Sequence, residues 1–143
     1  MKDMQVVAFL RETPCADRIR RGEYEGGLYN GYVAFPNDAV KWEWPEDDDE
    51  VYDGCGYSFY EVVDMHVQVH GGITFASTDF NPYGIPMIPL TAMPEPDSMV
   101  GWTIIGFDTL HLGDTKEMWT LDVIKKETMN LRDQVIALIN KQK

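Results

Sequence analysis

The stretch WTLDVIKKETMNLRDQVIALINK, residues 119–141, decides the fold. It contains neither Pro nor Gly, and its apolar residues recur every three or four positions, which is the spacing of one helix face. That face consists of Leu121, Ile124, Thr128, Leu131, Val135, Leu138 and Ile139. Thr120 suits the N-cap, because its hydroxyl can accept a hydrogen bond from a free amide of the first turn. The pattern predicts a long C-terminal helix that packs across one face of a sheet.

Four upstream stretches predict the strands of that sheet. They are Gln5–Leu10, Leu28–Phe35, Met65–Ala76 and Val100–Asp108. Met65–Ala76 shows the clearest alternation of apolar and polar residues, the signature of a strand with one buried face. Val100–Asp108 is apolar on both parities, as expected of a central strand covered on both faces. The Gly71-Gly72 pair inside the third stretch predicts a bulge or a close approach of another group to the backbone.

The remaining segments complete the predicted fold. Ala16–Gly22 is expected to form helical turns, and the proline-rich segment Asp79–Ser98 to form a long irregular loop. Val40–Trp44 fits a short strand or a loop, and Tyr57–Val63 fits a strand or a helix. The sequence predicts an α+β fold, a mostly antiparallel sheet with a long C-terminal helix packed on one face, in a single domain spanning residues 1–143.

The charge of the chain limits its partners. Its 143 residues include 24 acidic and 12 basic ones, a formal net charge of -12. Such a surface disfavours direct nucleic-acid binding and contact with anionic membranes, and it attracts basic partners or cations. The same charge also serves simple solubility. Phosphate-binding glycine loops of the common nucleotide-binding types are absent from the sequence.

The two cysteines, Cys15 and Cys55, form no CxxC pair and no disulfide framework. The apolar run near the N-terminus, Val6–Leu10, is too short for a signal peptide core or a membrane span. We therefore expect a cytoplasmic protein with reduced thiols and no membrane association. Cys55 stands between two glycines, where it is either a nucleophile or a small buried apolar residue.

The best candidate site joins His70-Gly71-Gly72-Ile73-Thr74 to the segment Gly106–Asp114. If the two strands pair, His70 meets Asp108, His111 and Asp114 at one end of the sheet. Imidazoles and carboxylates are ligands for zinc, manganese or iron, and they also perform acid/base chemistry near neutral pH. The ligand- or metal-binding candidates are His70, Gly71, Gly72, Thr74, Asp108, His111 and Asp114. Their spacing matches no standard metal motif, so the alternative is that these residues only form turns.

A second candidate surface combines two tryptophans with the acidic run that follows them in the sequence. Trp42 and Trp44 share a parity and either form an aromatic partner-binding patch or belong to the core. Asp47, Asp48 and Asp49 follow within a run of five acidic residues, which predicts a solvated loop that a basic partner can contact. The run does not fit a calcium loop, because Tyr60 occupies the position that needs a bidentate Glu.

One resemblance adds a context. His70-Gly71-Gly72-Ile73-Thr74-Phe75, Gly101-Trp102, and Gly106-Phe107-Asp108 with His111, Gly113 and Asp114 resemble a group of small uncharacterised phage and prophage proteins. That group has an HGGxT strand, a GFDxxHxGD strand end and a C-terminal helix. The resemblance implies an accessory protein in the host cytoplasm that binds a host protein or a small signalling ligand.

Three functional hypotheses follow. The first is a phage-type accessory protein that binds a host protein or a small ligand without turnover. The alternative is a small metal-dependent enzyme, hydrolase-like, that uses the His/Asp cluster and a divalent metal. The third is a structural subunit of a larger particle.

Overall fold

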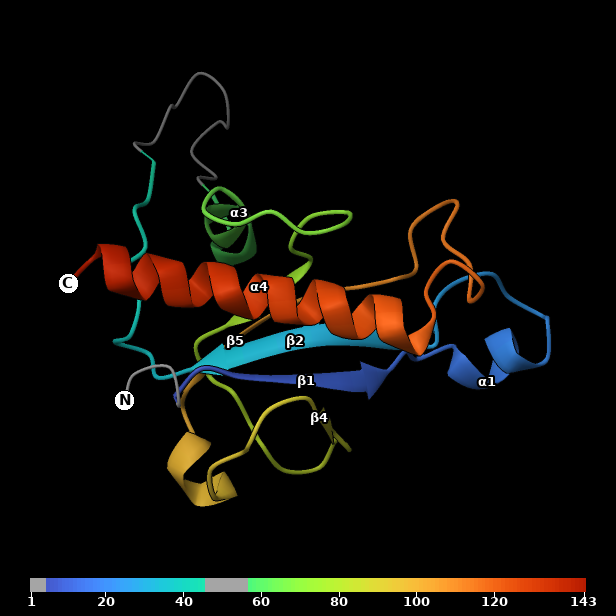
Figure 1. The fold of residues 1–143 in the computed structure, drawn as a ribbon, viewed down its shortest axis with the longest axis horizontal. Coiled ribbons are helices and arrows are strands. Elements are labelled where there is room, and N and C mark those ends of the chain that lie inside the picture. Colours follow the sequence, from blue (N-terminus) through green and yellow to red (C-terminus); the bar gives the residue numbers. More distant parts are fainter. Residues whose placement is uncertain (1–4, 46–56) are drawn as a thin grey trace.

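The structure is a computed structural model that describes residues 5–45 and 57–143, and within them five strands form one antiparallel sheet (Figure 1). The strands are β1 (Val7–Glu12), β2 (Tyr29–Phe35), β3 (Phe75–Ser77), β4 (Ile88–Pro89) and β5 (Thr103–Phe107), in the order β3-β5-β2-β1-β4. The helices are α1 (Ala16–Arg20), α3 (Phe59–Asp64) and α4 (Leu121–Lys141), with a 3₁₀ helix η2 (Pro96–Met99). The predicted α+β class is confirmed, with α4 packed on one face of the sheet.

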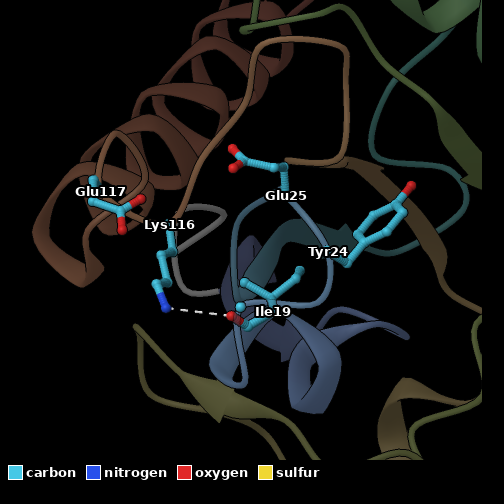
Figure 2. A pocket seen from close by; sticks show the side chains of 7 residues that line it. Ile19, Tyr24, Glu25, Lys116 and Glu117 are labelled. Atoms are coloured by element: carbon cyan, nitrogen blue, oxygen red, sulfur yellow. Dashed lines mark hydrogen bonds between the residues drawn. The ribbon is translucent and has the colours of Figure 1, made fainter.

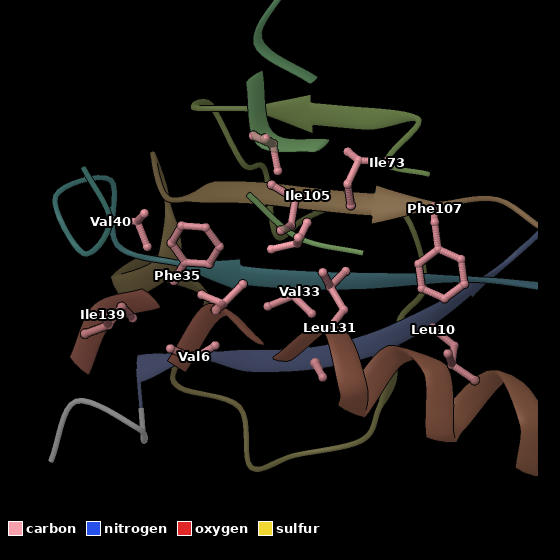
Figure 3. Close-up of a cluster of buried hydrophobic side chains, with 14 of the residues drawn as sticks. Val6, Leu10, Val33, Phe35, Val40, Ile73, Ile105, Phe107, Leu131 and Ile139 are labelled. Carbon is pink, nitrogen blue, oxygen red and sulfur yellow. The ribbon is translucent and has the colours of Figure 1, made fainter. Parts of the chain in front are cut away.

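Helix α4 lies along the sheet over β1 and β2 (Figure 1). Its fully buried residues are Ile124, Thr128, Leu131, Val135 and Ile139. The four apolar ones join a core with strand residues such as Val33, Phe35 and Ile105 (Figure 3). Removing one Leu or Ile side chain from water stabilises the fold by about 1.5–3 kcal/mol. Leu121 was expected in this face but is 44% exposed, because it lies at the edge of the stripe in the terminal turn.

The start of α4 and a close contact of the helix with the sheet each depend on a single residue. Thr120 is the N-cap, as predicted, and its Oγ1 accepts a hydrogen bond from the amide of Val123 at 3.4 Å. The helix crosses β2 closely at Gly31, where an added Cβ would stand 2.2 Å from the Thr128 hydroxyl oxygen. Thr128 satisfies its buried hydroxyl by donating to the Ile124 carbonyl at 2.7 Å. Gly31 therefore sets the distance between helix and sheet.

The other face of the sheet carries a second, smaller core. Its buried residues are Val7, Phe9, Ala34, Phe80, Met99 and Ile104. The segment between β3 and β5, which contains β4 and η2, covers this face. The irregular loop predicted for Asp79–Ser98 therefore includes a two-residue strand paired with β1 and most of a 3₁₀ helix. In β5, Ile104 belongs to this core and Ile105 to the core under α4. The prediction of a strand apolar on both parities, covered on both faces, is confirmed.

The predicted strand Met65–Ala76 is wrong over most of its length. Only Phe75 and Ala76 of this stretch belong to a strand, β3. Gly71 and Gly72 have φ angles of 73° and 80°, and these left-handed values turn the chain out of an extended path. The observed turn includes a hydrogen bond from the amide of Gly72 to the carbonyl of Val69 at 3.0 Å.

Side chains of α4 replace a partner strand for this segment. Gln134 accepts from the amide of Gln68 and donates to its carbonyl, both at 2.8 Å. Glu127 accepts from the amide of His70 at 2.8 Å. An extended segment on a helix surface also buries alternate residues, so the period-two pattern did not require strand pairing.

Two segments had two predicted structures each, and each adopts one of them. Tyr57–Val63 contains most of α3, which begins with a capping box: Glu61 accepts from both the amide and the hydroxyl of Ser58, at 2.9 and 2.7 Å. Residues 40–44 form no regular secondary structure. Among the described residues, the structure contains no helix that is both long and apolar enough to cross a membrane.

Candidate functional site

The two motifs of the predicted site meet beside the start of α4. The amide of Thr74 donates to the carbonyl of Gly106 at 3.0 Å, which joins the end of the first motif to β5. The glycine turn returns His70 toward the loop after β5, residues 108–114. The predicted convergence of the His and Asp residues therefore occurs, although it depends on a turn and a loop instead of two paired strands.

Asp114 and His70 form the centre of the cluster. His70 Nε2 lies 3.0 Å from Asp114 Oδ1, and the amide of His111 donates to Asp114 Oδ2 at 2.9 Å. The Asp114 side chain is 3% exposed, whereas that of His70 is 41% exposed. The His70 ring also meets the Trp119 ring edge-on, with ring centroids 4.7 Å apart. A buried carboxylate thus holds one nitrogen of a half-exposed imidazole.

The pKa of Asp114 shows which groups stabilise its charge. Burial alone raises this pKa, but the neighbouring donors outweigh burial and leave the pKa below the ordinary value of 3.8. These donors are the Trp119 indole, His70 and the amide of His111. The indole N–H has no partner at normal hydrogen-bond geometry among the described residues, so its contribution is a weaker polar attraction. Asp114 is therefore ionised at neutral pH, and His70 Nε2 acts as the donor.

His111 and Asp108 form a second pair on the same loop. Their Nε2 and Oδ1 atoms are 3.3 Å apart, and Asp108 Oδ1 also accepts from the amide of Leu110 at 3.0 Å. The His111 ring lies against Gly71, where an added Cβ would stand 2.3 Å from His111 Nε2. The predicted close approach at the glycine pair is this contact.

Two other predicted residues lie outside the cluster. Gly72 faces Asp64, whose Oδ1 accepts from the amide of Ile73 at 2.8 Å. The side chain of Thr74 is exposed, and Thr74 contributes its backbone amide to the sheet. In residues 5–45 and 57–143, no three His, Cys, Asp or Glu side chains are grouped so as to hold a metal ion. The geometry of this cluster therefore gives the divalent-metal interpretation no support.

Hollows of the surface flank the cluster. One of about 540 Å³ is lined by His70, Met118, Trp119, Val123, Lys126, Glu127 and Asn130. Another of about 510 Å³ lies beside His111 and Asp114 and extends to Tyr24. A smaller hollow of about 150 Å³ shares Tyr24 with it; there Lys116 Nζ donates to the Ile19 carbonyl at 3.3 Å (Figure 2).

The two tryptophans of the second candidate surface lie in different environments. Trp42 is half-buried and contacts Phe35, Phe59 and His66, with ring centroids 6.3, 6.0 and 5.5 Å away, so it belongs to the core. Trp44 is 54% exposed and stacks on Phe59. Asp47, Asp48, Asp49 and Cys55 lie outside the described residues.

Sequence reasoning missed Trp119 as a site residue. Trp119 directly precedes the N-cap of α4, so it was the first residue of the helical pattern. No local feature indicated that its ring would contact His70. The signal that was present is a large aromatic residue at a helix start, close in sequence to Asp114.

Comparisons with protein-family models, with curated proteins and with solved structures find no match for this chain.

Proposed function

We propose that this protein is a phage-type accessory protein that acts by binding, and that its site is the 540 Å³ hollow beside His70 and Trp119. The observation that carries the proposal is the fixed imidazole at the wall of this hollow. The volume lies within the range of about 300–1,000 Å³ that is typical of small-molecule sites. The occupant is therefore a small ligand with an apolar body.

The polar groups of the hollow define the ligand further. Because Asp114 is ionised, a neutral His70 ring carries its proton on Nε2 and has Nδ1 as its acceptor. Both carboxylate oxygens of Glu127 are already occupied, by the amide of His70 at 2.8 Å and the amide nitrogen of Asn130 at 3.3 Å. Met118 and Val123 supply exposed apolar surface. A planar apolar ligand with one N–H or O–H donor fits this combination.

The test compares indole with benzofuran, which has a similar shape and no N–H, by thermal shift and by amide chemical-shift changes. We expect indole to produce the larger, saturable response. Val123→Trp should fill the hollow and abolish the response. Leu121→Trp places the same ring at an exposed position of α4 that does not line this hollow, and should leave the response intact. Equal responses in the two variants, or none in the parent, would reject the hollow as the site.

A second candidate function has one observation in its favour. A buried, ionised carboxylate bonded to a half-exposed imidazole is the arrangement that orients a general base. The measurement is hydrolysis of p-nitrophenyl acetate by the parent, His70→Gln and His66→Gln. A rate that His70→Gln lowers tenfold and His66→Gln leaves unchanged would favour a hydrolase-like enzyme. Equal rates in all three would exclude it.

A further inference from the structure

Arg11 occupies the face of the sheet opposite α4, where the alternation of β1 continues from Val7 and Phe9. Its guanidinium carbon lies 5.3 Å from the ring centroid of Phe9, 5.0 Å from that of Tyr32 and 5.9 Å from that of Phe80. The charge is therefore held over aromatic faces, an arrangement worth about 0.5–2 kcal/mol. The residue is half-buried.

This cation has no anionic partner in the described part of the chain. Its guanidinium makes no hydrogen bond and no ion pair there, and its Nε is buried without a partner. The exposed Arg20 and Arg21 do form ion pairs, with Glu12 and Asp17 and with Glu23 respectively. Burial lowers the pKa of Arg11, and the interaction with Tyr32 is the one effect that opposes this shift. An arginine nevertheless remains charged at neutral pH. Leaving a cation unpaired in a chain with twice as many acidic as basic residues costs stability.

Asn30 adds a second donor directly beside this cation. It is the cross-strand partner of Arg11 in the register of β1 and β2, and it is 7% exposed. Side chains at such paired positions stand on the same face, with Cβ atoms about 4.5–5.5 Å apart. Asn30 Oδ1 accepts from the amide of Thr109 at 3.0 Å, which fixes the orientation of the carboxamide. Its Nδ2 donor has no partner among the described residues.

Tyr32 and Phe75 complete the surroundings. The Tyr32 hydroxyl has no hydrogen-bond partner among residues 5–45 and 57–143, and its ring meets Phe75 edge-on at 6.3 Å between centroids. Phe75 is 44% exposed. In register, Tyr32 and Phe75 both pair with Gly106 of β5, so the two rings flank a position without a side chain. An apolar surface therefore adjoins the three donors.

We propose that Arg11, Asn30 and Tyr32 form a binding site for the carboxylate of a small aromatic or apolar acid, whose body lies against Phe75. The guanidinium matches the planar two-oxygen geometry of a carboxylate. The net charge of -12 favours a singly charged ligand over phosphate or a polyanion. This site is independent of the hollow at His70, because α4 residues line that hollow and Arg11 lies on the opposite face of the sheet.

The test titrates the full chain with sodium benzoate at constant ionic strength and follows amide chemical shifts and the melting temperature. Benzamide, the neutral analogue, and inorganic phosphate are the comparison ligands. We expect saturable binding of benzoate, with benzamide and phosphate at least tenfold weaker. Equal binding of benzamide would show an apolar contact only, and equal binding of phosphate would show a general anion site; either result overturns the carboxylate assignment.

Two variants locate the site. Arg11→Gln removes the charge, and Asn30→Asp keeps the oxygen that accepts from Thr109 while supplying an internal anion to Arg11. Both should weaken benzoate binding at least tenfold, and Asn30→Asp preserves the hydrogen bond that the fold needs. Arg18→Gln is the control, since Arg18 is exposed and lies over the Tyr24 ring at 5.6 Å. Unchanged binding in Asn30→Asp, or the same loss in Arg18→Gln, would overturn the proposal.

Discussion

Replacing Asp114 with Asn removes one charge from the centre of the His/Asp cluster with almost no change of shape. The carboxylate is 3% exposed and accepts two hydrogen bonds, from His70 Nε2 at 3.0 Å and from the amide of His111 at 2.9 Å. Asn keeps one acceptor oxygen and presents an amide group where the second donor points. A hydrogen bond to a buried charged group contributes about 1.5–3 kcal/mol. We expect Asp114→Asn to lower the free energy of unfolding by about 2 kcal/mol at pH 7.

The pH dependence of this loss has a definite sign. The pKa of Asp114 in the folded chain lies below the ordinary 3.8, so its ionised form stabilises the fold at pH values above 3.8. That stabilisation disappears as the pH falls from 3.8 through the folded pKa. The difference in the free energy of unfolding between parent and Asp114→Asn should therefore be present at pH 5 and shrink below pH 3.8.

The assay is urea denaturation followed by circular dichroism at several pH values between 3 and 7. Asp108→Asn is the matched control: its side chain is 32% exposed, and Asn retains the oxygen that accepts from the amide of Leu110. We expect this control to change the free energy of unfolding by less than about 0.5 kcal/mol. Equal losses in the two variants, or a difference for Asp114→Asn that persists unchanged at pH 3, would refute the reasoning.

Three further predictions concern packing and backbone. Leu131→Ala, at a position 0% exposed, should lower the free energy of unfolding by about 2–5 kcal/mol in chemical denaturation. Gly71→Ala should destabilise more than Gly84→Ala: both φ angles are positive, but a Cβ meets an imidazole only at the first position, so similar unfolding midpoints would contradict the contact. Trp42→Ala should cost about 2 kcal/mol or more, while Trp44→Ala should cost less than about 1 kcal/mol, as measured by thermal melting.

Local sequence patterns predicted most of the elements because each depends on neighbours along the chain. The apolar stripe and Thr120 predicted α4, and the two-sided apolar pattern predicted β5. The prolines of residues 79–98 predicted an irregular loop but did not reveal the short strand β4 or η2, which lie in this segment. Helix α3 also had a local signal, the capping box of Ser58 and Glu61. This signal favours a helix over a strand for the segment.

The prediction failed at Met65–Ala76 because alternation reports burial on one side without naming the partner. Here the partner is mainly the surface of α4, through Glu127 and Gln134, and not another strand. The same limit applied to Arg11. It directly follows the predicted strand Gln5–Leu10, but whether an acidic side chain of the described residues lies near it depends on the fold.

The sequence by itself determined where the long helix begins and ends, which strand is buried on both faces, and which His and Asp residues are available for a site. Those features depend on periodicity and on capping, which act over a few residues. Only the tertiary structure decided that His70 reaches Asp114 and Trp119 and that His111 lies on Gly71. It also decided that Arg11 stands beside Asn30 with no anionic partner among residues 5–45 and 57–143. These contacts join residues far apart in the chain, and they follow from the packing of α4 and the loops around the sheet, which no local pattern encodes.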